Sequence, residues 1–175
     1  MKKIFFISFL GLLCFCMSCN DTSTTASDSK DSRTQKNLDA NRVVMKAFET
    51  GDVSGLDSVI ADDFVDHTDR GDKVGRDSLK AMVAWVRSMN KDMKAEIIKE
   101  VADDDYVFSW MTLSGDHDGS MAPKGPFKMK AIQVTKFNND GKATEHWEYM
   151  EMAEMMKMMG QAPGGDVKKV DSLKK

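Results

Sequence analysis

Cysteine is scarce in this sequence of 175 residues, and its placement excludes several kinds of site. The three cysteines, Cys14, Cys16 and Cys19, all lie within the first 19 residues. The rest of the chain therefore cannot form a disulfide between its own residues, and it has no thiolate to act as a nucleophile or a metal ligand. We expect it to be stable through its hydrophobic core alone.

The sequence also lacks an excess of basic residues. The net charge is −3, and it becomes −5 when the first 18 residues, with Lys2 and Lys3, are set aside. A nucleic-acid interface needs a basic patch, so this charge argues against one. The sequence has no glycine-rich phosphate loop, no serine nucleophile elbow and no histidine spacing typical of zinc, so we expect neither a cofactor nor a metal.

The longest apolar run lies at the start of the chain. It covers residues 4–15, follows two lysines and is too short for an ordinary transmembrane helix. Small Ser18 before Cys19 resembles a bacterial lipobox. Residues 1–18 are therefore predicted to be a lipoprotein signal peptide. A lipid on Cys19 would then anchor the protein in the bacterial cell envelope, on the periplasmic or the outer-surface face. An ordinary secretory signal is the alternative.

Composition divides the remaining chain into a tether, a domain and a tail. Residues 19–36 are rich in Ser, Thr and Asp and cannot bury a core, so they are predicted to form a flexible polar tether. Residues 37–160 carry the periodic apolar patterns of one domain. Residues 161–175 form a polar C-terminal tail.

The apolar patterns of the domain predict helices first and strands afterwards. Helical spacing covers residues 38–50, 54–60 and 76–90, and alternation covers residues 93–102, 106–115, 127–137 and 143–151, with a brief extended piece at residues 64–68. Asn138 to Gly141 is a hairpin signal, because Asn and Gly tolerate positive φ, so the last two strands should pair antiparallel. This order indicates an α+β domain in which a curved antiparallel sheet wraps over helices and leaves a cone with an open mouth.

The last predicted strand carries chemically useful side chains on both faces. Trp147, Tyr149 and Glu151 share one face, whereas His146, Glu148 and Met150 share the other. We expect the first face to line an apolar pocket together with Trp110 and Phe64. His146, on the opposite face, is predicted to be structural or exposed. The methionines of residues 150–159 follow helical spacing, which favours core packing over the alternative of a thioether copper site.

Four short motifs resemble, in order, those of the SnoaL-like polyketide cyclase family of the nuclear transport factor 2-like superfamily. They are Phe64-Val-Asp-His-Thr68, Gly115-Asp-His-Asp-Gly119, Gly141-Lys-Ala-Thr-Glu-His-Trp147 and Met158-Met-Gly160. The resemblance covers roughly residues 37–160. It implies a cone-shaped sheet packed on three N-terminal helices, a pocket for a small hydrophobic ligand and, as in many relatives, a homodimer across the sheet.

The resemblance also implies catalytic residues. The family's acid/base aspartate lies four residues after the motif tryptophan, where this chain has Glu151, and His67 and His117 fall on pocket motifs. If they converge, these three residues could move protons on a small carbonyl compound, in polyketide cyclase-like or ester cyclase-like chemistry. The alternative is a non-catalytic module of the cell envelope that holds a small hydrophobic ligand. In that case the two histidines would only hydrogen-bond loops at the mouth.

Overall fold

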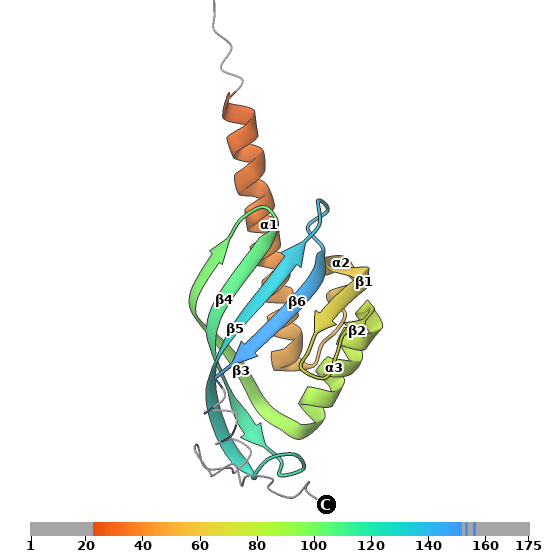
Figure 1. Ribbon diagram of the computed structural model, residues 1–175, viewed down its shortest axis with the longest axis vertical. Helices are drawn as coiled ribbons and strands as arrows, with labels where there is room; N and C mark the ends of the chain where they lie inside the picture. The colour runs from red at the N-terminus through yellow and green to blue at the C-terminus, as the bar shows by residue number, and fades with distance from the viewer. Residues whose placement is uncertain (1–22, 152, 154–155, 157–175) are drawn as a thin grey trace, which may run out of the picture.

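The computed structural model describes the backbone of residues 23–151, 153 and 156, and side chains from Ser32 onward. The elements, shown in Figure 1, are α1 (Ser23–Thr50), α2 (Leu56–Val59), β1 (Ile60–His67), β2 (Lys73–Val74), α3 (Arg76–Met89), β3 (Asn90–Ala102), β4 (Tyr106–His117), β5 (Gly125–Phe137) and β6 (Ala143–Met150). The predicted signal peptide with Cys19, most of the methionine segment and the C-terminal tail lie outside the described residues. The α+β class is confirmed.

Six strands form one curved, open sheet in the order β2-β1-β6-β5-β4-β3. The predicted hairpin is confirmed, because Phe137 of β5 pairs with Ala143 of β6 and Gly141 takes a positive φ of 67° in the turn. The expectation of a wholly antiparallel sheet is corrected, because β1 pairs with β6 in parallel. Three hairpin reversals from β3 onward fix the direction of β6. The segment that includes α3 carries the chain from β1 to the opposite edge of the sheet, where β3 lies, and leaves β1 beside β6.

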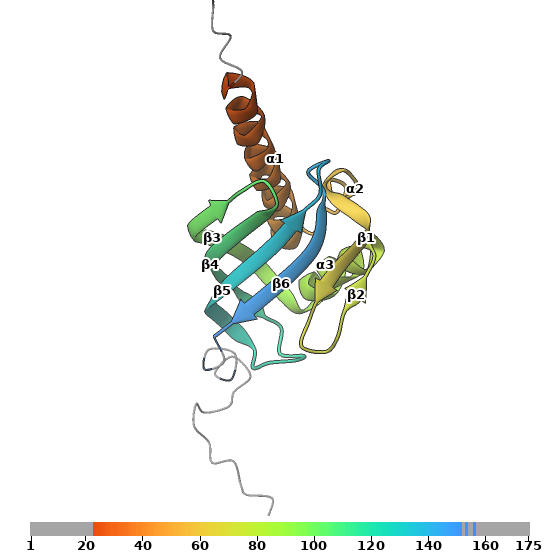
Figure 2. The same cartoon turned by 45° about the horizontal axis from the view of Figure 1, so that its top comes forward.

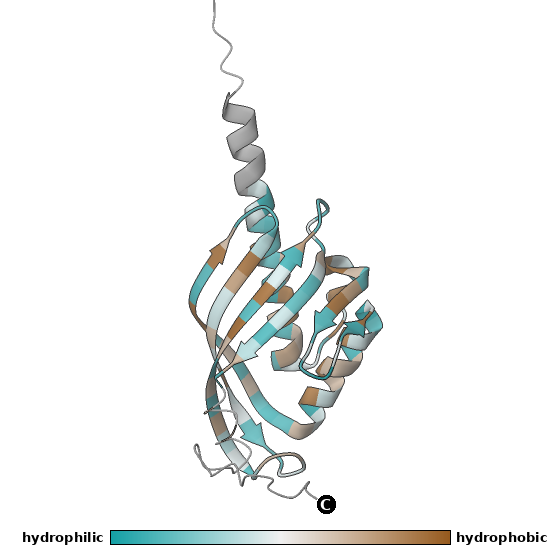
Figure 3. Ribbon diagram, viewed as in Figure 1, coloured by the Kyte–Doolittle hydropathy of each residue, from teal (hydrophilic) through white to brown (hydrophobic). Residues whose placement is uncertain are grey.

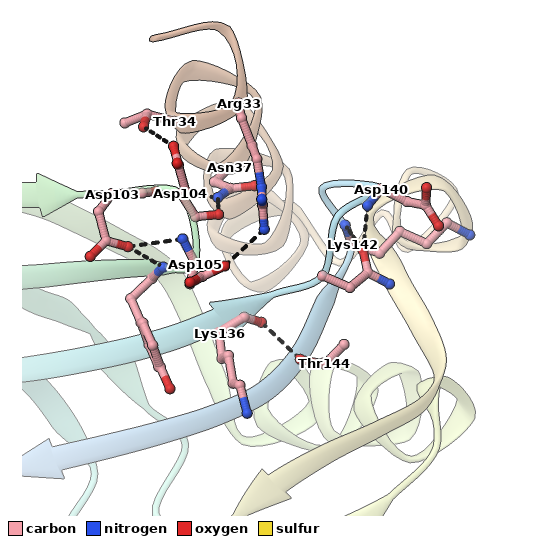
Figure 4. A network of polar contacts seen from close by, with 12 residues as sticks. Arg33, Thr34, Asn37, Asp103, Asp104, Asp105, Lys136, Asp140, Lys142 and Thr144 are labelled. Carbon is pink, nitrogen blue, oxygen red and sulfur yellow. Dashed lines mark hydrogen bonds and ion pairs between the residues drawn. The ribbon is translucent and has the colours of Figure 1, made fainter. Parts of the chain in front are cut away.

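Helix α1 begins at Ser23, within the segment predicted to be a flexible tether. It passes behind the sheet and projects beyond its end (Figures 1 and 2). Polar contacts with the β3–β4 turn hold its middle: Arg33 pairs with Asp105 at 2.8 Å, and Asn37 Nδ2 donates to the Asp104 carbonyl oxygen at 2.9 Å (Figure 4). Because the partner turn is itself polar, this part of the helix needs no apolar face. Among the described helices, none is long and apolar enough to cross a membrane.

The core lies between the helices and one face of the sheet, which we call the inner face. Its buried side chains come from both layers and include Leu56, Ile60, Phe64, Val83, Val107 and Phe137. Fully burying one such side chain contributes about 1.5–3 kcal/mol. The other side of the sheet, the outer face, exposes large apolar side chains, namely Phe108, Trp110, Ile132 and Tyr149. Along the strands, apolar and polar residues are interleaved (Figure 3).

A buried polar network joins α1 to the sheet within this core. Asn41, only 3% exposed, donates from Nδ2 to Ser109 Oγ at 3.1 Å and to Glu100 Oε1 at 3.2 Å, and its Oδ1 accepts from Thr135 Oγ1 at 3.3 Å. Ser109 also donates to Glu100 at 3.1 Å. These bonds fix how α1 lies across β3, β4 and β5, because a buried amide accepts few alternative partners.

Candidate functional site

Four polar side chains come together on the inner face where β1, β6 and β5 lie side by side. Phe64 of β1 is buried in the core, so alternation places Asp66 on the same face. Asp66 pairs with His146 of β6, and Glu148 pairs with Gln133 of β5. We call Asp66, His146, Glu148 and Gln133 the inner cluster.

A carboxylate orients the histidine of this cluster. His146 Nδ1 lies 2.8 Å from Asp66 Oδ1, and the two side chains are 18% and 14% exposed. Because the carboxylate accepts a hydrogen bond, Nδ1 carries the proton, and Nε2 of a neutral ring keeps its lone pair. No other hydrogen bond to the His146 ring exists among the described side chains. The pair therefore has the arrangement of an oriented general base.

Glu148 has the properties of a proton donor. Burial raises the pKa of the Glu148 carboxyl by more than His146 and Gln133 lower it, and the Asp66 carboxylate adds a smaller increase. A carboxyl group whose pKa is raised holds its proton closer to neutral pH, which suits a general acid. Two residues apart on one strand, Glu148 and His146 point to the same side, roughly 7 Å apart at their Cα atoms.

Apolar side chains continue the inner face beyond the cluster. Met129 and Ala131 precede Gln133 on the same face of β5, and Met111 lies opposite Ala131 on β4. All three apolar side chains are buried. An apolar wall beside a few convergent polar groups is typical of a small-molecule site. No group of His, Cys, Asp or Glu suited to a metal ion occurs among the described residues.

The structure places His67, a predicted catalytic residue, on the outer face. The ring of His67 stacks on Trp147, with centroids 4.6 Å apart, and pairs with Asp72 at 2.9 Å and Glu145 at 3.2 Å. Both ring nitrogens are therefore occupied by carboxylates, and neither faces the inner cluster.

His117 and Glu151 lie away from His67 and from each other. His117 ends β4 and is buried, with its ring edge-on to Phe127 at 6.3 Å. Its strand, β4, lies three strand spacings from β1, which is about 14 Å across the sheet. By alternation along β4, the His117 side chain is on the inner face. Glu151 directly follows β6 and is exposed. The three predicted catalytic residues are thus not brought together.

The predicted pocket residues also divide between the two faces. Trp110, Trp147 and Tyr149 share the outer face, whereas Phe64 is buried in the inner core. The residues that sequence reasoning missed are those of the inner cluster. Alternation along β6 correctly predicted that His146 and Glu148 lie on the opposite face from Trp147. The aromatic side chains, however, led us to expect the pocket on the face that carries Trp147.

A shallow, open depression of about 550 Å³ lies on another part of the surface. Its lining comes from α1 and the loop that follows it: Arg42, Val43, Lys46, Thr50, Asp52, Ser54 and Gly55. It shares no residue with the inner cluster, and its lining mixes positive and negative charges. The candidate site is therefore the inner cluster.

Comparisons with known proteins agree with the fold. The family model described as SnoaL-like polyketide cyclase matches residues 38–159. Among solved structures, IdmH from Streptomyces antibioticus, a proposed polyketide cyclase, is similar with 22% identity and a TM-score of 0.60, over 71% of this chain and 98% of IdmH. AclR from Streptomyces galilaeus, a proposed hydroxylase, has 19% identity and a TM-score of 0.62, over 74% of this chain and 99% of AclR.

A third structure, of a nuclear transport factor 2-like protein from Anabaena variabilis, has 17% identity and a TM-score of 0.58, over 68% of this chain and 90% of that one. At these identities the structures show the shared fold alone. No curated protein matches the sequence.

Proposed function

Because this chain belongs to the SnoaL-like polyketide cyclase family, we propose that its domain performs cyclase-like or ester cyclase-like acid–base chemistry on a small, apolar carbonyl compound. The observation that carries the proposal is the inner cluster, where an Asp66-oriented His146 lies beside a Glu148 carboxyl whose pKa is raised by burial. Such chemistry requires a general base and a general acid whose surroundings adjust their protonation states to these roles.

The proposed proton transfers balance within the inner cluster. His146 Nε2 takes the proton from the carbon next to the substrate carbonyl, while Glu148 gives its proton to the carbonyl oxygen, which forms an enol. Asp66 stabilises the resulting imidazolium through Nδ1. The enol carbon then attacks a second carbonyl carbon of the same substrate, so the new C–C bond forms as that C=O π bond opens to an alkoxide. The enol proton returns to Glu148, and the His146 imidazolium gives its proton to the alkoxide, which restores both side chains. The apolar wall formed by Met111 and Met129 excludes water from these steps.

The test begins with the ligand. Mass spectrometry of small molecules that copurify with the domain supplies candidate substrates, and turnover is then measured for wild type, Glu148→Gln and Asp66→Asn. Glu148→Gln keeps the shape of the side chain but removes its proton, so turnover should fall by about 10²–10⁴-fold while binding persists. Glu151→Gln is the matched control, because Glu151 is exposed. Unchanged turnover in Glu148→Gln together with its loss in Glu151→Gln would overturn the assignment.

The second candidate is a non-catalytic module that binds a small hydrophobic ligand. One observation favours it: Glu151, at the position of the family's acid/base residue, lies apart from His67 and His117. A protein that retains a ligand through purification but turns over none of the candidate substrates, in wild type or variants, would support this reading.

We propose a lipid anchor on Cys19 in the bacterial envelope. The support is the sequence alone, namely the lysine-flanked apolar run and Ser18 before Cys19. Metabolic labelling with a fatty-acid probe tests it. Labelling should be lost in Cys19→Ala, and a variant that still labels would refute the anchor.

We also propose that two domains pair through the outer face. Phe108, Trp110, Ile132 and Tyr149 are each 43–60% exposed there, on neighbouring strands. A stable homodimer buries roughly 800 Å² on each partner, with aromatic side chains enriched. Trp110→Lys should convert a dimer to a monomer in sedimentation velocity, with unchanged circular dichroism. A wild-type monomer would contradict the proposal.

A further inference from the structure

The parallel seam between β1 and β6 carries a histidine–carboxylate pair on each face. On the inner face, His146 of β6 binds Asp66 of β1; on the outer face, His67 of β1 binds Glu145 of β6. The two pairs are adjacent along both strands, because Asp66 is opposite His146 and the next residue, His67, is opposite Trp147. A change on the outer face therefore acts on backbone that also positions the inner cluster.

The His67 ring requires two protons for its contacts. Nδ1 lies 2.9 Å from Asp72 Oδ1, and Nε2 lies 3.2 Å from Glu145 Oε2. A neutral imidazole has one N–H, so one of the two carboxylates would then face a nitrogen lone pair. The imidazolium donates to both, and its charge also favours the stack on Trp147. The bond to Asp72 first, and that to Glu145 next, raise the pKa of His67.

The charges around Glu145 keep this partner of His67 ionised. Lys136 Nζ lies 2.6 Å from Glu145 Oε1, and this bond, followed by that from His67, lowers the pKa of Glu145. The other charged residues between His67 and the end of β2, namely Asp69, Arg70 and Lys73, make no hydrogen bond or ion pair to the ring among the described contacts. The hydrogen bonds of the His67 ring therefore depend on the charges of His67, Asp72 and Glu145, and Lys136 acts only through its ion pair with Glu145.

We propose that His67 is a proton-dependent clasp: as an imidazolium it joins the β1–β2 hairpin, through Asp72, to β6, through Glu145, and so holds Asp66 and His146 in register on the inner face. His67 is then a positioning residue, not one that touches a ligand. The sign follows from its raised pKa. The stabilisation is fully present below the pKa of the unfolded chain and is lost as the pH rises through the higher pKa of the folded protein. In acid the contact with Glu145 ends when that carboxylate takes up a proton, at a pH below the ordinary pKa of a glutamate.

The positioning part of this inference rests on the proposed function, but its test needs no substrate. The pKa of His67 and backbone hydrogen exchange are measured by NMR on the full-length protein, for wild type, Asp72→Asn and His67→Gln. Asp69→Asn is the matched control, since it removes a carboxylate from the same loop that does not contact the ring. Asp72→Asn should lower the pKa of His67, and Asp69→Asn should leave it nearly unchanged.

Between about pH 6 and pH 8, the protection factors of β1 and β2 amides in wild type should fall roughly tenfold more than those of β4, and His67→Gln should abolish this difference. The backbone amide chemical shifts of Asp66 and His146 should move in His67→Gln, because the register between these two residues relaxes. A wild-type His67 pKa at or below its ordinary value, an equal fall of the protection factors in His67→Gln, or unmoved amide shifts of Asp66 and His146 in that variant would overturn the clasp. Loss of turnover in Glu148→Gln tests the proposed function separately.

Discussion

Replacing Asn41 by alanine should destabilise the domain strongly, because the amide is the centre of the buried network between α1 and the sheet. The substitution removes three hydrogen bonds, of 3.1, 3.2 and 3.3 Å, to Ser109, Glu100 and Thr135. A hydrogen bond contributes about 1 kcal/mol net, and one to a charged group about 1.5–3 kcal/mol. We therefore expect a loss of about 3–5 kcal/mol in the free energy of unfolding, a large part of a typical total of about 5–15 kcal/mol.

Urea denaturation followed by tryptophan fluorescence measures this loss. Gln35→Ala is the matched control on the same helix, because its amide makes one exposed hydrogen bond, to Asp39 at 2.9 Å, and its removal should cost less than about 0.5 kcal/mol. Asn41→Asp places an oxygen against Glu100, so it should destabilise at neutral pH and recover partly in acid. A loss below about 1 kcal/mol for Asn41→Ala would refute the reasoning, since it would mean that water or a rearranged partner replaces the amide.

Three further substitutions test other parts of the fold. Glu148→Gln should make the folded state more stable than wild type near pH 8, and this gain should shrink as the pH falls. The reason is that a carboxyl group whose pKa is raised on folding costs stability once it ionises. A difference in the free energy of unfolding that does not change with pH, measured by chemical denaturation, would contradict this. Phe64→Ala should cost about 3–5 kcal/mol in the same assay, since Phe64 is 2% exposed, and a loss under about 1.5 kcal/mol would show that the core collapses around it. Gly115→Ala should destabilise the β3–β4 pair, because a Cβ would lie 2.9 Å from the Lys91 carbonyl oxygen, and amide exchange unchanged in β3 would exclude that clash.

The sequence predicted much of the fold because its signals are local. Helical spacing located α3 over residues 76–90, and the Asn138–Gly141 turn predicted the β5–β6 pairing that the structure shows. The parallel contact between β1 and β6 could not be predicted in this way, because it joins residues about 80 positions apart without a turn between them. The early start of α1 was also missed, since its partners lie in the distant turn at residues 103–105.

The candidate site was missed for a different reason. Alternation along β6 gives two sets of side chains but does not tell which set faces the helices. Aromatic residues usually mark the inner side, yet here Trp147 and Tyr149 lie on the outer face with Trp110. The polar pairs Asp66–His146 and Glu148–Gln133 occupy the inner face instead, which burial of Met111 and Ala131 identifies.

The positions of Glu148 and Glu151 connect the assignment of the two sheet faces to the proposed function. Glu148 lies within β6, whereas Glu151 follows the end of that strand at Met150 and is exposed, and three residues of chain span at most about 10 Å between their Cα atoms. The two carboxylates therefore lie in different environments, one raised in pKa by burial and one exposed to solvent. The proposed chemistry therefore uses Glu148 with His146 on the inner face, while the outer face remains available for the proposed pairing of two domains. The seam between β1 and β6 joins these two surfaces, and His67 and His146, one on each side of it, are the histidines through which a proton on one surface can affect the other.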